Sequence, residues 1–179
     1  MARRCDPCAE VTIISSEAAV QLTARFMLRH PAHVIALGGG AGLVPGAPGT
    51  AGTLLAFPLY WVLASFCVTL TLLTLIALGF ALGVWACGRT GRALGVADHG
   101  AMVWDEIIAF MLVLVFTPAG LLWQACAFLL FRMFDILKPP PIRYYDRKLH
   151  GGFGVMFDDL LAAFYTLLVL AVARMLIAG

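Results

Sequence analysis

Five carboxylates stand where predicted apolar helices meet polar segments, and these side chains are the best suited to chemistry in this sequence. They are Asp105, Glu106, Asp135, Asp158 and Asp159. Negative charges gathered on one side of a helical bundle repel one another unless cations neutralise them. Hard divalent cations take oxygen ligands, and Mg²⁺ typically binds through a few carboxylates together with substrate phosphate. We therefore expect all five acids to hold one or two Mg²⁺ ions.

Ordinary helix capping is a competing explanation for some of these acids. Asp and Glu are favoured in the first turn of any helix, which accounts for Asp105–Glu106 and Asp158–Asp159 as well as a metal does. It does not account for Asp135, near the C-terminal end of its predicted helix, where the helix dipole disfavours an acid. Asp135 could instead pair with Arg132 or Lys138, each three residues away. Both interpretations stay open.

Cations near these acids could bind a phosphate group. Lys138 follows Asp135 by one helical turn and precedes three prolines, which fix the direction of its backbone. Arg132 is surrounded by apolar residues, and an arginine inside a membrane segment is typically functional. Both cations suit phosphate. Arg143, in the basic segment after the prolines, is a third candidate for substrate binding.

A glycine-rich stretch precedes the first long apolar segment. Leu37–Thr53 contains seven glycines and two prolines and is expected to be an irregular loop. The backbone amide of Gly49 and the hydroxyls of Thr50 and Thr53 could bind a phosphate at the start of the following helix. A plain turn between membrane helices explains the same pattern without a ligand.

The elements that must position these residues are membrane helices. The chain has 179 residues, enough for one domain, and is 62% hydrophobic and 12% charged. A soluble domain has about 25% charged residues, so the composition predicts an integral membrane protein. The net charge of +2 gives no indication of nucleic-acid binding.

Five helices cross the membrane on this interpretation, in an all-α polytopic bundle. Leu54–Ala86 has 33 residues without a charge, and one helix of that length would span roughly 50 Å against a hydrocarbon core of about 30 Å. We expect two helices with a turn near Ser65–Thr69. Ile107–Phe131 is divided by a turn signal at Thr117–Gly120, and its second helix continues through Asp135. The fifth helix is Leu160–Ile177.

Two hairpins return the chain to the side it left, so the polar connections should converge on one face. These are the glycine-rich stretch, Arg89–Glu106 and Lys138–Asp159, and they carry Arg89, Arg92, Lys138, Arg143, Arg147 and Lys148. The positive-inside rule makes this face cytoplasmic. Residues 1–30 are predicted to be a separate amphipathic segment at the interface, with 31–179 as the membrane-embedded domain. No apolar segment typical of a signal peptide follows Arg3 and Arg4.

The cysteines predict no chemistry of their own. Cys5 and Cys8 form one C-x-x-C, but nothing in the sequence completes a set of four zinc ligands. Cys126 and Arg132 have the spacing of cysteine-dependent phosphatases. That chemistry needs a tight loop around the phosphate, whereas the intervening residues are bulky, apolar and predicted to be helical.

Three long blocks of this sequence, together with the apolar run that follows the last of them, resemble one known family. They are "GLVPGAPGTAGTLLAFP" (Gly42–Pro58), "GVADHGAMVWDEIIAF" (Gly95–Phe110) and "FRMFDILKPPPIRYYDRKLHGGFGVMFDD" (Phe131–Asp159). From about residue 31 to the end, the chain is similar to the phosphatidylglycerophosphatase A family of bacterial membrane lipid phosphatases. Thr53 stands where that family often has serine, and Pro140 where an aromatic residue is common.

The resemblance implies a reaction and a place. The family removes the terminal phosphate of phosphatidylglycerophosphate with Mg²⁺, giving phosphatidylglycerol, and works at the cytoplasmic face of the bacterial inner membrane. The expected catalytic residues are then Asp105, Glu106, Asp135, Lys138, Asp158 and Asp159. Arg132 and Lys138 would clamp the phosphate, and Gly49–Thr53 would contribute amides and a hydroxyl.

Several questions stay open at this point. A water activated by the metal is the nucleophile that we favour, and a carboxylate that forms an aspartyl phosphate is the alternative. A transporter or channel with an acidic metal site is a different class of protein, and it would spread polar residues through the helix interiors. A purely structural bundle would not need the acids. The oligomeric state is also undetermined.

Overall fold

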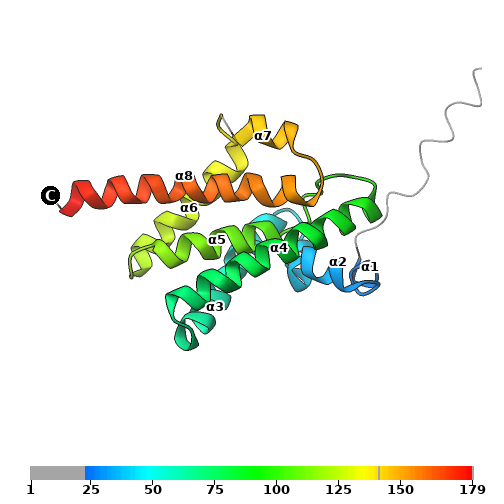
Figure 1. The fold of residues 1–179 in the computed structure, drawn as a ribbon, viewed down its shortest axis with the longest axis horizontal. Coiled ribbons are helices and arrows are strands. Elements are labelled where there is room, and N and C mark those ends of the chain that lie inside the picture. Colours follow the sequence, from blue (N-terminus) through cyan, green and yellow to red (C-terminus); the bar gives the residue numbers. More distant parts are fainter. Residues whose placement is uncertain (1–22, 141, 179) are drawn as a thin grey trace, which may run out of the picture.

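Every regular element in the described part of the chain is helical (Figure 1). The computed structural model describes residues 23–140 and 142–178. The elements are α1 (Ala24–Met27), α2 (Pro31–Ala36), the 3₁₀ helix η2 (Gly38–Leu43), α3 (Pro48–Phe66), α4 (Thr69–Leu94), α5 (Trp104–Phe116), α6 (Leu121–Leu137), α7 (Ile142–Lys148) and α8 (Gly152–Ala178). The expected all-α class is confirmed. The interfacial segment predicted for residues 1–30 falls mostly outside the described residues.

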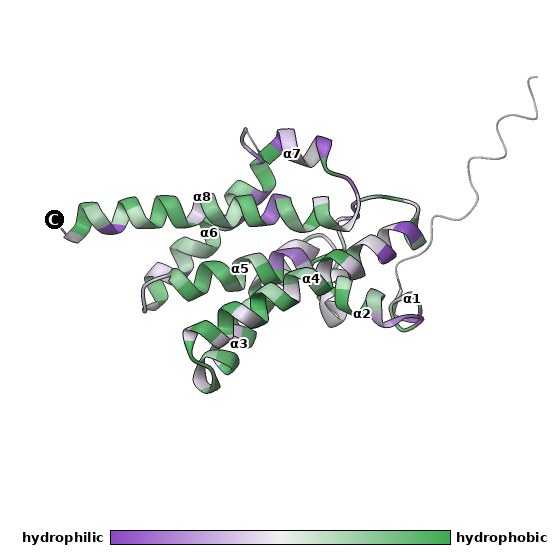
Figure 2. Ribbon diagram, in the orientation of Figure 1, coloured by the Kyte–Doolittle hydropathy of each residue, from purple (hydrophilic) through white to green (hydrophobic). Residues whose placement is uncertain are grey.

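Three of these helices, α3, α4 and α8, are long and apolar enough to cross a membrane. Only 22–28% of the residues in their most apolar windows are buried, so most of this apolar surface faces outward (Figure 2). A soluble monomer rarely exposes so much apolar area, and the protein is therefore a membrane protein. The expected count of about five spans is not confirmed, because α5 has 13 residues and α6 has 17, whereas a crossing needs about 20.

Both expected helical hairpins are present. The first turns between α3 and α4 at Cys67 and Val68, inside the predicted range. The second turns between α5 and α6 within Thr117–Gly120, where Gly120 has φ +124°, a conformation that favours glycine. As predicted, α6 continues through Asp135.

Two predicted loops are partly helical. The glycine-rich stretch Leu37–Thr53 forms η2, and α3 already begins at Pro48, because proline without an N–H is well suited to the first helical turn. Helix α4 does not end before Arg89 but continues to Leu94, where Gly95 closes it at φ +73°.

A third difference from the predicted elements concerns the start of α8, and it changes the position of two candidate acids. The predicted loop between Tyr144 and Met156 contains most of α7, and α8 begins at Gly152 instead of Leu160. Asp158 and Asp159 therefore lie in the second turn of a long helix and not at the end of a loop. Their side chains are held by helix packing, which fixes their direction.

The short helix α5 is the centre of the bundle. Nine of its 13 residues are buried, and it packs against α3, α4 and α8. A helix that is apolar on all sides is stable only when other helices surround it, which explains why α5 has no lipid-facing stripe. Phe110 at its middle contacts Phe57 of α3 and Phe131 of α6, with ring centroids 5.2 and 5.4 Å apart. The core thereby joins the helices that carry the candidate site.

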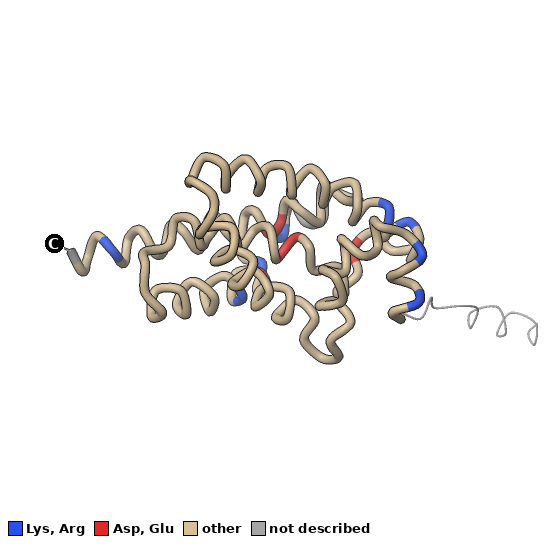
Figure 3. The backbone as a smooth tube through the Cα atoms, turned by 90° about the horizontal axis from the view of Figure 1, so that it is seen from below, with Lys and Arg blue, Asp and Glu red and all other residues tan. Residues whose placement is uncertain are grey.

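Charged residues are distributed unevenly along the molecule. Basic positions gather at the end opposite the C-terminus, and others lie beside acidic positions in the middle of the molecule (Figure 3). Arg174 lies near the C-terminal end of α8. Four of the candidate acids, Asp105, Glu106, Asp158 and Asp159, are buried, whereas Asp98 is exposed.

Candidate active site

Three carboxylates from two helices form a buried cluster. Asp105 and Glu106 lie in the first turn of α5, and Asp159 lies in the second turn of α8. One ligand oxygen from each lies within 4.8 Å of the others. Asp105 is 7% exposed, Glu106 9% and Asp159 3%. We refer to Asp105, Glu106 and Asp159 as the acidic triad.

The acidic triad has the chemistry of a divalent-cation site. Asp105 Oδ1, Glu106 Oε2 and Asp159 Oδ2 are buried and have no hydrogen-bond partner among the described residues. Burying a carboxylate oxygen without a partner is costly, and three like charges at this spacing repel. A hard cation that accepts oxygen ligands would remove both costs. The donor set therefore fits a metal ion, without identifying which one.

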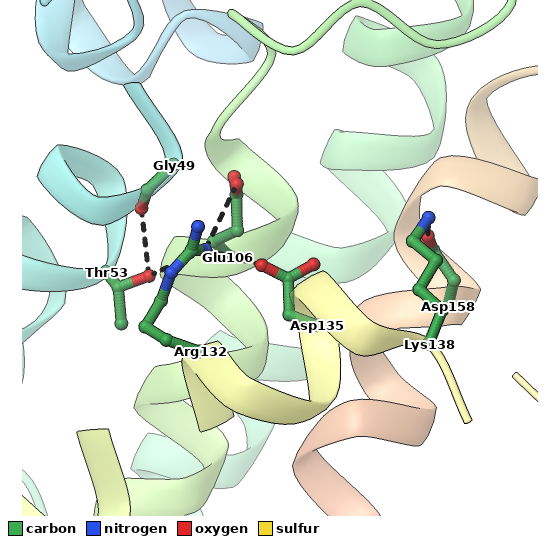
Figure 4. A network of polar contacts seen from close by, with 7 residues as sticks. All are labelled: Gly49, Thr53, Glu106, Arg132, Asp135, Lys138 and Asp158. Atoms are coloured by element: carbon green, nitrogen blue, oxygen red, sulfur yellow. Dashed lines mark hydrogen bonds and ion pairs between the residues drawn. The ribbon is translucent and has the colours of Figure 1, made fainter. Parts of the chain in front are cut away.

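Arg132 connects the triad to two other elements (Figure 4). Its Nη1 donates to Asp135 Oδ2 at 2.5 Å, one turn further along α6, and lies 3.6 Å from Glu106 Oε1. The same nitrogen lies 3.5 Å from Thr53 Oγ1 on α3. Thr53 in turn donates to the carbonyl oxygen of Gly49 at 2.9 Å. One guanidinium thus joins α3, α5 and α6 beside the triad.

Gly49 makes room for this arrangement. A Cβ atom at Gly49 would overlap Glu106 Oε1 and would lie 3.0 Å from both terminal nitrogens of Arg132. The sequence suggested Gly49 as a phosphate-binding amide. The structure adds that the missing side chain lets two charged groups approach the backbone, which no local sequence signal indicates because both groups come from other helices.

A second ion pair lies beside the triad. Lys138 Nζ donates to Asp158 Oδ2, joining the end of α6 to α8. Lys138 has φ +42° and is the non-glycine residue with positive φ in the described chain. Because Pro139 follows it, its backbone is driven away from the right-handed helical region. The side chain leaves α6 toward α8, which agrees with the predicted role of the prolines.

The five predicted acids are therefore brought to one region but not into one ligand set. The triad holds three of them, while Asp135 pairs with Arg132 and Asp158 pairs with Lys138. The alternative pairing of Asp135 with Arg132 is present. We retain the triad as the candidate metal ligands and treat Asp135 and Asp158 as partners of the two cations.

The remaining predicted substrate-binding residues lie further out. Thr50 is partly exposed in the first turn of α3. Arg143 is exposed on α7, where it lines a surface depression with Pro140, Tyr144 and Lys148. Cys126 and Arg132 both lie in the continuous helix α6, so the residues between them form no loop around a phosphate.

In a helical membrane protein, a buried acidic triad beside Arg132 and Lys138 can bind a metal ion and a phosphate group. The sequence model of the family described as phosphatidylglycerophosphatase A matches residues 34–174. The chain belongs to the phosphatidylglycerophosphatase A family and is a phosphatase.

Curated relatives agree with this assignment. The chain is 47% identical over 147 residues to "Phosphatidylglycerophosphatase A" of Haemophilus influenzae, which covers 81% of this chain and 90% of the relative. It is 42% identical over 139 residues to the Escherichia coli protein of the same name, covering 77% and 80%. A Bacteroides thetaiotaomicron protein named "Putative phosphatidylinositol-3-phosphatase" is 38% identical over 151 residues, covering 80% and 94%. No solved structure matches the chain.

Proposed function

We propose that this protein hydrolyses phosphatidylglycerophosphate to phosphatidylglycerol and inorganic phosphate in phospholipid synthesis. The observation that carries the proposal is the acidic triad beside Arg132, inside a chain of the phosphatidylglycerophosphatase A family. The alternative of a transporter or channel is set aside, because the family to which the chain belongs is a family of enzymes.

Hydrolysis of this substrate moves a defined set of atoms. The oxygen of a water molecule forms a bond to phosphorus, and the bond between phosphorus and the ester oxygen breaks. The ester oxygen leaves with the electron pair and takes up a proton, giving the lipid alcohol and inorganic phosphate. Negative charge spreads over the phosphoryl oxygens in the transition state, so cationic groups placed there accelerate the reaction.

Arg132 and Lys138 are the cations that we assign to this task. Asp135, Glu106 and the Thr53 hydroxyl hold the Arg132 guanidinium in one orientation, and Asp158 holds Lys138. A side chain held in place before substrate arrives loses little entropy on binding it. Asp135 and Asp158 are thus positioning residues in this proposal.

Mg²⁺ is the cofactor that we propose, with Asp105, Glu106 and Asp159 as its ligands. When bound, the ion would neutralise the triad and polarise the substrate phosphate. Glu106 then has a second role. It belongs to the ion site and also contacts Arg132, so it links the metal to the residues that would bind the phosphate.

We further propose that the site faces the cytoplasm of the bacterial inner membrane. Arg89 and Arg92 lie at the C-terminal end of α4, and Lys138, Arg143 and Lys148 follow α6. Both groups lie on the side of the membrane where α5 and α8 begin, and lysine and arginine are enriched in cytoplasmic connections. The phosphate of a lipid head group would meet the triad at that surface.

The test is phosphate release from phosphatidylglycerophosphate in mixed micelles by the purified full chain, with Mg²⁺ and with EDTA. We expect Mg²⁺-dependent release by the wild type and a large loss in Asp159→Asn. Glu17→Gln is the matched control, because it also removes one negative charge but lies outside the segment that the family model matches. Release that is indifferent to both EDTA and Asp159→Asn would contradict the proposed site.

Substrate choice is tested in the same assay. One relative is named for a phosphatase acting on phosphatidylinositol 3-phosphate, so that lipid is the appropriate competitor. We expect a higher kcat/KM for phosphatidylglycerophosphate. A higher value for the inositol lipid would retain the lipid phosphatase and replace the substrate.

A further inference from the structure

An apolar groove runs from the acidic triad along the outside of the bundle. It has a volume of about 290 Å³ and lies between α4, α5 and α8. Its lining residues are Leu73, Ile76, Ala77, Phe80, Asp105, Ile108, Ala109, Leu112, Met156 and Leu160. Asp105 is the one charged residue among them, and it is a member of the triad.

The groove has a polar end and an apolar end. Asp105 lies in the first turn of α5, and Leu112 lies two turns deeper in the same helix. Helix α4 runs in the opposite direction beside it, because Gly83 faces Trp104 at the start of α5, whereas Gly79, one turn earlier in α4, faces Ile108, one turn further along α5. Leu73, two turns before Phe80 in α4, therefore lies toward the deep end. The groove leads away from the triad toward the apolar middle of the bundle.

Close helix packing narrows the groove beyond its polar end. A Cβ atom at Gly83 would overlap Met156 Sδ and lie 2.7 Å from Trp104 Cδ1, so both side chains fill the space between α4, α5 and α8 there. Ala77, by contrast, is exposed on the apolar outer surface of α4. Side chains thus close the groove at the end near the basic connections. Along its length it is open at the apolar outer surface of α4, which would face lipid in a membrane.

We propose that this groove holds an acyl chain of the lipid substrate, which enters sideways from the bilayer so that its phosphate reaches the acidic triad. The inference rests on the proposed function. A lipid phosphomonoester must place its head group at charged residues while its chains stay in apolar surroundings. Asp105 lines both the groove and the triad, and its buried Oδ1 has no partner among the described residues. Because the groove shares Asp105 with the triad, the substrate, which has both a phosphate and acyl chains, fits it better than a lipid without a terminal phosphate.

A second apolar groove lies between α3 and α6 and provides the control. Leu54, Phe57, Trp61, Leu121, Ala125, Phe128 and Leu129 line it, and none of them belongs to the triad. Ala77 and Ala125 are both exposed alanines on helix surfaces, each lining one of the two grooves. Ala77→Leu and Ala125→Leu therefore add the same three carbon atoms to one groove each.

The kinetic test compares a long-chain and a short-chain substrate. We expect Ala77→Leu to lower kcat/KM for dioleoyl phosphatidylglycerophosphate roughly tenfold or more, because added side-chain volume in a hydrophobic pocket discriminates at that scale. Turnover of the dihexanoyl form should fall less, because a shorter chain fills less of the groove. Ala125→Leu should behave as the wild type with both substrates. Thermal unfolding of each variant shows whether the fold is retained.

The binding test does not depend on turnover. Wild-type protein in vesicles is irradiated with phosphatidylglycerophosphate that carries a diazirine at the end of one acyl chain, and the labelled residues are mapped by mass spectrometry. We expect labels at Leu73, Ala77 and Leu112. Labels confined to Leu54, Trp61 or Leu129, or selective loss of long-chain turnover in Ala125→Leu, would assign the chain to the other groove and overturn the inference.

The two proposals fail in different ways. If the wild type releases no phosphate from any form of the lipid, the proposed function fails, and the photolabel still decides whether a chain occupies the groove. If the wild type is active but Ala77→Leu turns over both substrates normally, the groove proposal fails while the function stands.

Discussion

The guanidinium of Arg132 donates to Asp135 Oδ2 at 2.5 Å and at the same time lies 3.6 Å from Glu106 Oε1. One cation therefore bridges an acid of its own helix and a member of the acidic triad. Because these groups are largely buried, the orientation of Arg132 depends on all of its partners together.

Arg132→Lys should lower kcat/KM for phosphatidylglycerophosphate by roughly 10- to 100-fold, the scale seen when a supporting contact at a metal site is lost. Lysine keeps the charge but not the planar fork that reaches Asp135, Glu106 and Thr53. Steady-state phosphate release measures the effect. The control is Arg143→Lys, the same change at an exposed site on α7, and equal losses in both variants would show that the fork of Arg132 has no special role.

Gly49→Ala should impair the enzyme although it adds one methyl group. The new Cβ would overlap Glu106 Oε1 and approach both terminal nitrogens of Arg132. The side chains of Glu106 and Arg132 must therefore move away from the backbone of α3. We expect a loss of activity and a lower unfolding temperature. Gly100→Ala is the matched control, because a Cβ there meets no atom within 4 Å. Normal activity in Gly49→Ala would mean that the two charged groups can shift without consequence.

The hydroxyl of Thr53 should matter more than its methyl group. Thr53 is fully buried and its Oγ1 stands between Arg132 and the Gly49 carbonyl. Thr53→Val keeps the shape but removes both contacts of the hydroxyl, with Arg132 and with the Gly49 carbonyl, and each such hydrogen bond contributes about 0.5–1.5 kcal/mol. We expect a clear fall in activity and stability for Thr53→Val and a small effect for Thr53→Ser. The reverse order of the two variants would exclude the hydroxyl contact as the cause.

Lys138 and Asp158 should show strong coupling in a double-mutant cycle. The Asp158 side chain is 7% exposed and that of Lys138 is 24% exposed, and removing one partner leaves a buried charge, at a cost of about 3–5 kcal/mol. Lys138→Met and Asp158→Asn should each lower the unfolding temperature, and the double variant should lose less than the sum. Additive losses would show that the two charges do not interact in the folded protein.

The acidic triad predicts opposite effects of one substitution with and without metal. In metal-free protein, Asp159→Asn removes like-charge repulsion among buried carboxylates and should raise the unfolding temperature. Added Mg²⁺ should stabilise the wild type, since a ligand that binds only the folded state shifts the equilibrium toward it. That stabilisation should disappear in Asp159→Asn, while Glu17→Gln retains it. A Mg²⁺-induced rise of equal size in Asp159→Asn would falsify the triad as the ion site.

Much of the site was predictable because residue type limits what a side chain can do in a membrane. Acids, an arginine and a lysine among apolar segments are too costly to stay without partners. In the structure Asp105, Glu106 and Asp159 meet, Arg132 lies beside Glu106, and Lys138 pairs with Asp158. The hairpin turns at Cys67 and Thr117–Gly120 were also predictable, since length and turn residues act locally. The boundaries of α4 and α8 were not, because polar and glycine residues there continue helices that other helices stabilise.

The sequence by itself determined the membrane class, the family and the set of charged residues from which the candidate site is built. Only the tertiary structure decided which acids form the triad and which pair with Arg132 and Lys138, because these groupings depend on distances between helices remote in the chain. The same holds for Gly49, whose missing side chain matters only where Glu106 and Arg132 approach it. Helix directions and side-chain volumes set those distances, and neither can be obtained from local residue patterns.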